Sequence, residues 1–117
     1  MDKELKQLVE NLCDELTSAM HTRWEHSRGV TTHGYSVGQK YIRIFSEEKG
    51  QMKSAWGFIN KKKFQKGNTG ITFEAGDVLK CAGWQTPALN APRGNLFKGY
   101  HIDPNSMRLY GPDSVSY

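Results

Sequence analysis

One amphipathic helix at the start of the chain constrains the fold more than any other feature of the sequence. Its apolar residues recur at spacings of three and four, at Leu5, Leu8, Val9, Leu12, Leu16, Ala19 and Met20. This period places them on one face of a helix, and that face must be covered by the rest of the chain. Asp2 is the expected N-cap and Gly29 the expected stop, so we predict a helix within residues 1–28.

The middle of the chain has the composition of β-strands. Lys40–Phe45 and Lys53–Asn60 are rich in β-branched and aromatic residues, and we predict that Ser46–Gln51 joins them as a hairpin loop. The preceding segment, Gly29–Gly38, is rich in Gly, Thr and Ser. That composition predicts a linker or an irregular edge segment.

Two further strands are expected toward the C-terminus. Ile71–Cys81 has strand composition with a break at Ala75–Gly76, and Met107–Tyr110 is a short apolar run. Because side chains alternate between the two faces of a strand, we also predict that Trp56 and Phe58 lie on the same face of the sheet.

These elements predict a single domain over residues 1–117. A chain of this length has room for one modest core. We expect an α+β fold in which the helix, within 1–28, packs on a small twisted antiparallel sheet that is either open or curled into a small barrel. The strand-rich region spans 39–110 and contains a loop at 82–97, and 111–117 is expected to be a frayed tail.

The net charge of +4 conceals a strong asymmetry along the chain. Residues 1–38 carry four Lys/Arg and six Asp/Glu, residues 39–98 carry eleven and four, and residues 99–117 carry one and two. The segment charges are therefore −2, +7 and −1. Positive charge concentrated in one segment suits a polyanionic partner such as nucleic acid, although an ordinary solvated sheet face has the same composition.

Several classes of function find no support in the sequence. No apolar run approaches the roughly 20 residues of a membrane-spanning helix, and the acidic, amphipathic N-terminus differs from a secretory signal. Cys13 and Cys81 match no metal-binding spacing, so we expect two reduced thiols, with a disulfide as the alternative. His21 and His26 do not share a helix face, and no catalytic arrangement is visible. We therefore expect no metal, no cofactor, no membrane partner and no enzymatic activity.

A loop near the end of the basic segment has an unusual concentration of shaping residues. Between Gly76 and Phe97, glycines and prolines that fix or free the backbone flank a single tryptophan, Trp84. Binding residues concentrate on loops that are carried by rigid strands. The alternative for Trp84 is an apolar plug in a small core.

Basic and aromatic side chains are interleaved throughout the middle of the chain. Single-stranded DNA or RNA is held by basic grooves with aromatic platforms, because every nucleotide offers a phosphate charge and a base with a π-face. The candidate nucleic-acid contacts are Lys40, Arg43, Lys61, Lys62, Lys63, Lys80, Trp84 and Arg93. For Arg93, the alternative is a guanidinium that binds carbonyl oxygens of its own loop.

Five short segments occur in a fixed order: KYIRI, SAWGFIN, GDVLKCAGW, TPA and RGNLF. This set resembles a family of small uncharacterised proteins of tailed bacteriophages, which carry KYxRI, GD(I/V)xK, WxxPA and RGN(L/I)F segments. The resemblance covers Lys40 to Phe97 and implies a phage origin and expression in a bacterial host. It carries over no activity. Lys61–Ala75 departs from the pattern as an insertion before Gly76.

Together these features predict a phage-encoded, non-enzymatic accessory protein that binds nucleic acid, located in the host cytoplasm or in the virion. The alternative is a protein-binding module, either a minor virion component or an inhibitor of a host factor. In that case Trp84 and Arg93 are the expected interface anchors, because both residue types are enriched at binding hot spots.

Overall fold

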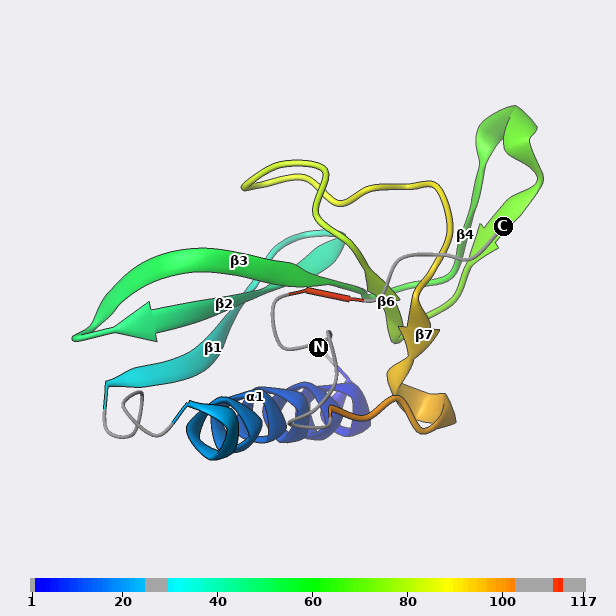
Figure 1. Ribbon diagram of the computed structural model, residues 1–117. Helices are drawn as coiled ribbons and strands as arrows, with labels where there is room; N and C mark the ends of the chain where they lie inside the picture. The colour runs from blue at the N-terminus through cyan, green and yellow to red at the C-terminus, as the bar shows by residue number, and fades with distance from the viewer. Residues whose placement is uncertain (1, 25–29, 103–110, 113–117) are drawn as a thin grey trace.

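The computed structural model describes residues 2–24, 30–102 and 111–112. One helix lies against one face of an open sheet, a loop lies over the other face, and a short hairpin extends beyond the end of the sheet (Figure 1). The elements are α1 (Lys3–Arg23), β1 (Thr31–Val37), β2 (Tyr41–Glu48), β3 (Gln51–Asn60), β4 (Phe64–Lys66), β5 (Ile71–Phe73), β6 (Asp77–Leu79) and β7 (Gly94–Asn95), with short 3₁₀ turns at Gly67–Thr69 and Leu96–Lys98.

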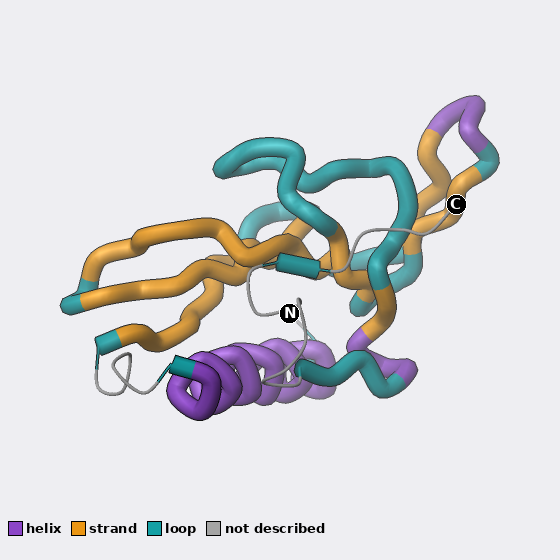
Figure 2. Tube along the Cα trace, in the orientation of Figure 1, coloured by secondary structure: helices purple, strands orange, loops and turns teal. Residues whose placement is uncertain are grey.

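The main sheet has five strands in the order β1-β2-β3-β6-β7, and every pairing in it is antiparallel. β4 and β5 form a separate two-stranded hairpin that projects from the end of the sheet (Figure 2). The predicted α+β class is therefore confirmed. Of the two predicted forms of the sheet, the open one is observed, since β1 and β7 are its two edges.

The helix begins where the sequence predicts and ends earlier than predicted. The Asp2 carboxylate accepts a hydrogen bond from the Glu4 backbone N–H at 2.7 Å, which caps the first turn. The helix ends at Arg23, because Trp24 already has an extended backbone with φ −126° and ψ 94°. Its apolar face packs against the sheet and forms the main core with Ile42, Ile44, Trp56, Ile59 and Val78.

The segment expected to be a linker or an irregular edge segment is a regular strand at the edge of the sheet. Thr31–Val37 pairs with β2 along its whole length, from Thr31 opposite Glu48 to Val37 opposite Ile42. The helix supports this strand from one side, since Thr17 Oγ1 accepts from the His33 backbone N–H at 2.9 Å. Tertiary contacts thus override a composition that by itself favours irregular structure.

The β2–β3 turn is tighter than the predicted hairpin loop. Only Lys49 and Gly50 lie between the strands, and both have positive φ, 54° and 79°. Such a two-residue turn matches the right-handed twist of the flanking strands, so pairing continues to Glu48 and Gln51.

Trp56 and Phe58 lie on opposite faces of the sheet, so the prediction that they share a face is wrong. Ile44 pairs with Gly57 and Phe45 with Ala55, which leaves Trp56 as the extra residue of a β-bulge. The bulge interrupts the alternation of side chains. Trp56 therefore packs under the helix, while Phe58 packs with a second, smaller cluster on the other face.

The expected third strand, Ile71–Cys81, is divided between two sheets. β5 pairs with β4 in the projecting hairpin, whereas β6 pairs with β3 in the main sheet. Gly76, with φ 87°, makes the turn between them. The predicted strand at 107–110 lies outside the described residues. In the predicted tail, Pro112 is buried and lies close to Gly57. A Cβ atom added to Gly57 would lie 2.9 Å from the Pro112 ring.

Candidate nucleic-acid interface

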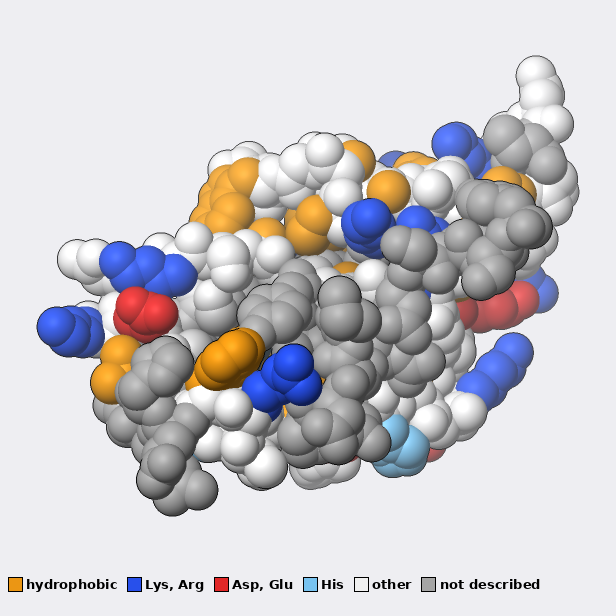
Figure 3. Space-filling model, viewed as in Figure 1, with side chains coloured by type: hydrophobic (Ala, Val, Ile, Leu, Met, Phe, Trp, Pro, Cys, Tyr) orange, Lys and Arg blue, Asp and Glu red, His pale blue; other side chains and the backbone are white. Residues whose placement is uncertain are grey.

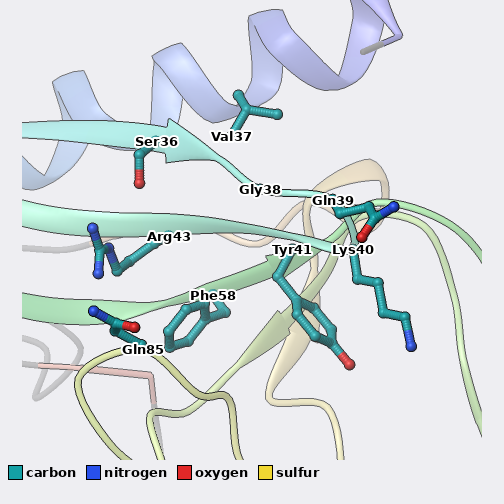
Figure 4. A pocket seen from close by; sticks show the side chains of 9 residues that line it. All are labelled: Ser36, Val37, Gly38, Gln39, Lys40, Tyr41, Arg43, Phe58 and Gln85. Atoms are coloured by element: carbon teal, nitrogen blue, oxygen red, sulfur yellow. The ribbon is translucent and has the colours of Figure 1, made fainter.

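A hollow of about 370 Å³ opens on the sheet face that lies away from the helix. The end of the β1–β2 hairpin, the adjoining part of β3 and the tip of the loop after β6 form its walls. Its lining residues are Ser36, Val37, Gly38, Gln39, Lys40, Tyr41, Arg43, Phe58 and Gln85. Figure 4 shows the Arg43 and Gln85 side chains at one end, the Phe58 ring in the middle, and the Lys40 and Tyr41 polar groups at the other end.

The loop after β6 is folded back on itself, which carries Trp84 over the sheet. The backbone N–H groups of Ala82 and Gly83 both donate to the Thr86 carbonyl, at 2.9 and 3.1 Å. A bridge between Cys81 and Pro87 closes the base of this turn. An apolar patch marks the tip of the loop in Figure 3, and 43% of the Trp84 surface is exposed.

The Arg43 guanidinium stacks on the Trp84 ring, with Cζ 5.1 Å from the ring centroid. Arg43 forms no ion pair with any residue that the structure describes. Its Nη2 donates weakly to the Met52 sulfur at 3.9 Å, and its buried Nε has no hydrogen-bond partner. The cation is therefore held by an aromatic face and keeps donors for an external acceptor.

Aromatic rings form the floor of this region and continue toward the projecting hairpin. Tyr41 contacts Phe58 edge to face at 6.4 Å and Phe64 at 6.5 Å between ring centroids. Phe64 stacks on Phe73 at 5.0 Å. Burial raises the pKa of Tyr41, so its hydroxyl stays protonated and remains a hydrogen-bond donor at neutral pH.

A second hollow, of about 250 Å³, adjoins the first and shares Gln39 and Lys40 with it. Asn60, Lys62, Lys63 and Phe64 complete its lining. We call the two hollows together the basic groove. Lys62 and Lys63 are exposed, and Lys63 forms a surface ion pair with Glu74 at 3.8 Å. The basic groove thus combines three exposed lysines with Arg43 and an aromatic floor.

Residues 1–103 match the profile of a protein family described as a family of unknown function, DUF7717. The chain belongs to this family. Its motifs from Lys40 to Phe97 therefore lie inside the matched region. No curated protein and no solved structure matches the chain.

In this DUF7717 chain, the predicted contacts fall into three groups. Lys40, Arg43, Lys62 and Lys63 line the basic groove, and Trp84 covers one end of it. Lys61 has a structural contact next to the groove, because its Nζ donates to the Gly38 carbonyl at 3.0 Å.

Lys80 and Arg93 line neither hollow of the basic groove. Lys80 is exposed at the end of β6. Arg93 Nη1 donates to the Ala91 carbonyl at 2.6 Å and to Asn90 Oδ1 at 3.2 Å, so its guanidinium holds its own loop. This arrangement corresponds to the architectural alternative for Arg93.

Sequence reasoning missed Gln85 and Gln39 as parts of the site. Gln85 lies next to Trp84 in the chain, and that adjacency was the available signal. Gln39 occupies the β1–β2 turn, which could not be located while Gly29–Gly38 was expected to be irregular.

The described part of the chain contains neither a group of metal ligands nor a cysteine thiol with a lowered pKa. Within it, no three His, Cys, Asp or Glu side chains are grouped to hold a metal ion. Burial raises the pKa of the Cys13 thiol to about 12, and it also raises the pKa of Cys81. Both cysteines are free, and they pack on opposite sides of the sheet. Across residues 2–24, 30–102 and 111–112, no helix has the length and apolar character needed to cross a membrane.

Proposed function

We propose that this protein is a phage-encoded accessory protein that binds single-stranded nucleic acid along the basic groove. The observation that carries the proposal is the Arg43 guanidinium at one end of an aromatic-floored hollow, where it lies over the exposed Trp84 ring and has no carboxylate partner among the described residues. The motif set shared with tailed-phage proteins supports the phage origin, and with it a location in the host cytoplasm or virion.

The arrangement of charge and rings suits a single strand. Unpaired bases present faces that stack on aromatic side chains, and their phosphates remain outside, where lysines reach them. Tyr41 in the basic groove and Trp84 against Arg43 supply the accessible rings, while Lys40, Lys62 and Lys63 supply the outer charges. The helix, which carries acidic residues, lies on the other side of the sheet (Figure 1), so it does not oppose a strand bound here.

A salt titration tests the proposal. We expect a fluorescein-labelled oligothymidylate to bind at about 50 mM salt and to weaken steeply by about 200 mM, because bound phosphates release counterions. Fluorescence anisotropy measures this directly. No binding at about 50 mM salt would rule out the nucleic-acid function and favour the protein-binding module, with Trp84 as an interface anchor.

A double variant locates the phosphate contacts. Lys62→Ala with Lys63→Ala should reduce the slope of log affinity against log salt by about 1.4, since each of two lost contacts contributes about 0.7 for a single strand. Lys61 is left in place because its Nζ binds the Gly38 carbonyl. The matched control is Lys3→Ala with Lys6→Ala on the exposed helix surface, which removes the same charge and should leave the slope unchanged.

A further inference from the structure

The end of the basic groove that holds Arg43 and Gln85 has the chemistry of a base-reading site. Both side chains point toward this end, and the Phe58 ring lies beside them (Figure 4). From this geometry we propose that it binds guanine in preference to the other bases. This inference rests on the proposed single-stranded nucleic-acid function and specifies which nucleotide that same site selects.

The state of Arg43 supports the choice of a base with two adjacent acceptors. The Arg43 guanidinium lies over the Trp84 ring, with Cζ 5.1 Å from the ring centroid, and its flat fork of N–H donors suits two acceptors that lie side by side. None of the described acidic residues pairs with it. Guanine presents O6 and N7 side by side as acceptors, which matches the arginine fork.

Other bases match this end of the groove less well. Adenine offers the N7 acceptor beside an N6 amino donor, and that donor opposes the donors of a guanidinium. Thymine has no two adjacent acceptors, and cytosine combines its adjacent O2 and N3 acceptors with one donor group, N4–H₂, where guanine offers two. Gln85 adds an amide whose oxygen can accept from the N1–H and N2–H₂ groups of guanine, which are free in a single strand.

The distribution of charge favours base reading over phosphate binding at this end of the groove. A guanidinium and a glutamine amide can each donate to phosphate oxygens as well as to bases. The charge for the backbone lies instead at the other end of the hollow and beyond it, on Lys40, Lys62 and Lys63. This division of base reading and backbone binding is typical of nucleic-acid recognition.

The test uses oligothymidylates that differ in one central nucleotide. We expect the oligonucleotide with a central guanine to bind about 5- to 150-fold more tightly than those with adenine, cytosine or thymine there. Replacing that guanine by 7-deazaguanine removes the N7 acceptor and should abolish most of the preference. This comparison uses the unmodified protein, so it does not depend on any variant folding.

Arg43→Lys tests the role of the fork while keeping the charge. We expect the guanine preference to disappear and the salt-dependent binding of oligothymidylate to remain. The matched control is Arg23→Lys, because Arg23 also stacks on a tryptophan, Trp24, at 5.5 Å but lies outside the groove. It should retain the full preference.

The outcomes distinguish this inference from the proposed function. Equal affinity for all four oligonucleotides, with steep salt dependence, would overturn guanine selection and leave nucleic-acid binding intact. That result would indicate that Arg43 contacts a phosphate and not a base. A preference that survives both 7-deazaguanine and Arg43→Lys would also overturn the assignment of Arg43. Absence of binding to every oligonucleotide would remove the proposed function itself.

Discussion

The two faces of the sheet differ in how completely they are covered. On the helix face, Val9, Leu16, Ile44 and Ile59 have no exposed surface, and one continuous apolar stripe covers the strands. On the other face, Phe58, Phe73 and Leu79 are buried, but the residues around them are only half-buried.

The difference follows from the length of the covering segments. A helix of 21 residues presents several turns of aligned apolar side chains and closes its face of the sheet. The opposite face is covered by a three-residue strand pair and by an irregular loop, which leave hollows between them. Stability should therefore depend mainly on the helix face, and ligand binding on the opposite face.

The largest expected effect on stability comes from the helix face. Leu12 is 2% exposed within the main core, so Leu12→Ala should lower the free energy of unfolding by about 2–5 kcal/mol through lost burial and a residual cavity. Urea denaturation measures it. Lys6→Ala, on the exposed side of the same helix, should change it by less than about 0.5 kcal/mol. Similar values for the two variants would contradict the assignment of the core.

The seam between the helix and β1 should make stability depend on pH. Burial, followed by repulsion from His21, lowers the pKa of His33 from 6.5 to about 4. Thr17 Oγ1 lies 3.2 Å from His33 Nδ1 and also accepts from the His33 backbone N–H.

The sign follows from the lowered pKa. The contribution of His33 is complete above pH 6.5, the unfolded value, and is lost as pH falls toward about 4, because only the unfolded chain takes up the proton in that window. We expect a loss of about 3 kcal/mol across it. Urea denaturation midpoints of the unmodified protein and of His33→Gln, measured across this pH range, isolate the contribution of His33. An identical pH profile in the two proteins would refute that contribution.

A smaller loss is expected at Arg93, on the less covered side of the molecule. Arg93→Ala leaves the Ala91 carbonyl without its donor and should cost about 1–3 kcal/mol, seen as a lower melting temperature. Affinity for nucleic acid should fall only by the amount that the loss of one positive charge causes. Lys80→Ala removes the same charge from an exposed position and is the matched control. Loss of affinity in Arg93→Ala alone, with an unchanged melting temperature, would restore Arg93 to the site.

The smallest effect on stability is expected at Trp84, where the effect on binding should be largest. Trp84→Phe keeps an aromatic ring at a position where the tryptophan is 43% exposed, so the free energy of unfolding should change by less than about 0.5 kcal/mol. Trp84→Ala removes the ring, and affinity for oligothymidylate should then fall by about 1–3 kcal/mol if a base stacks there, whereas Trp84→Phe should retain most of the affinity. Phe97→Leu, at an aromatic residue that is 41% exposed outside the groove, is the control for binding.

Much of the candidate site could be located from composition, but its assembly could not. Lys40, Arg43, Lys62 and Lys63 stand out as basic residues near strands, and they do line one groove. Trp84 stands out as the aromatic centre of a shaped loop. Nothing in the sequence pairs Trp84 with Arg43, because that contact depends on how far the loop folds back over β2.

By itself, the sequence determined the helix, its buried face and the strand character of the middle segment, because these depend on local periodicity and residue type. The tertiary structure decided the rest. Thr31–Val37 became a strand through pairing with β2 and support from Thr17, and the bulge at Trp56 moved one aromatic side chain to the helix face. Both outcomes depend on contacts between residues far apart in the chain, and local sequence patterns do not predict those contacts.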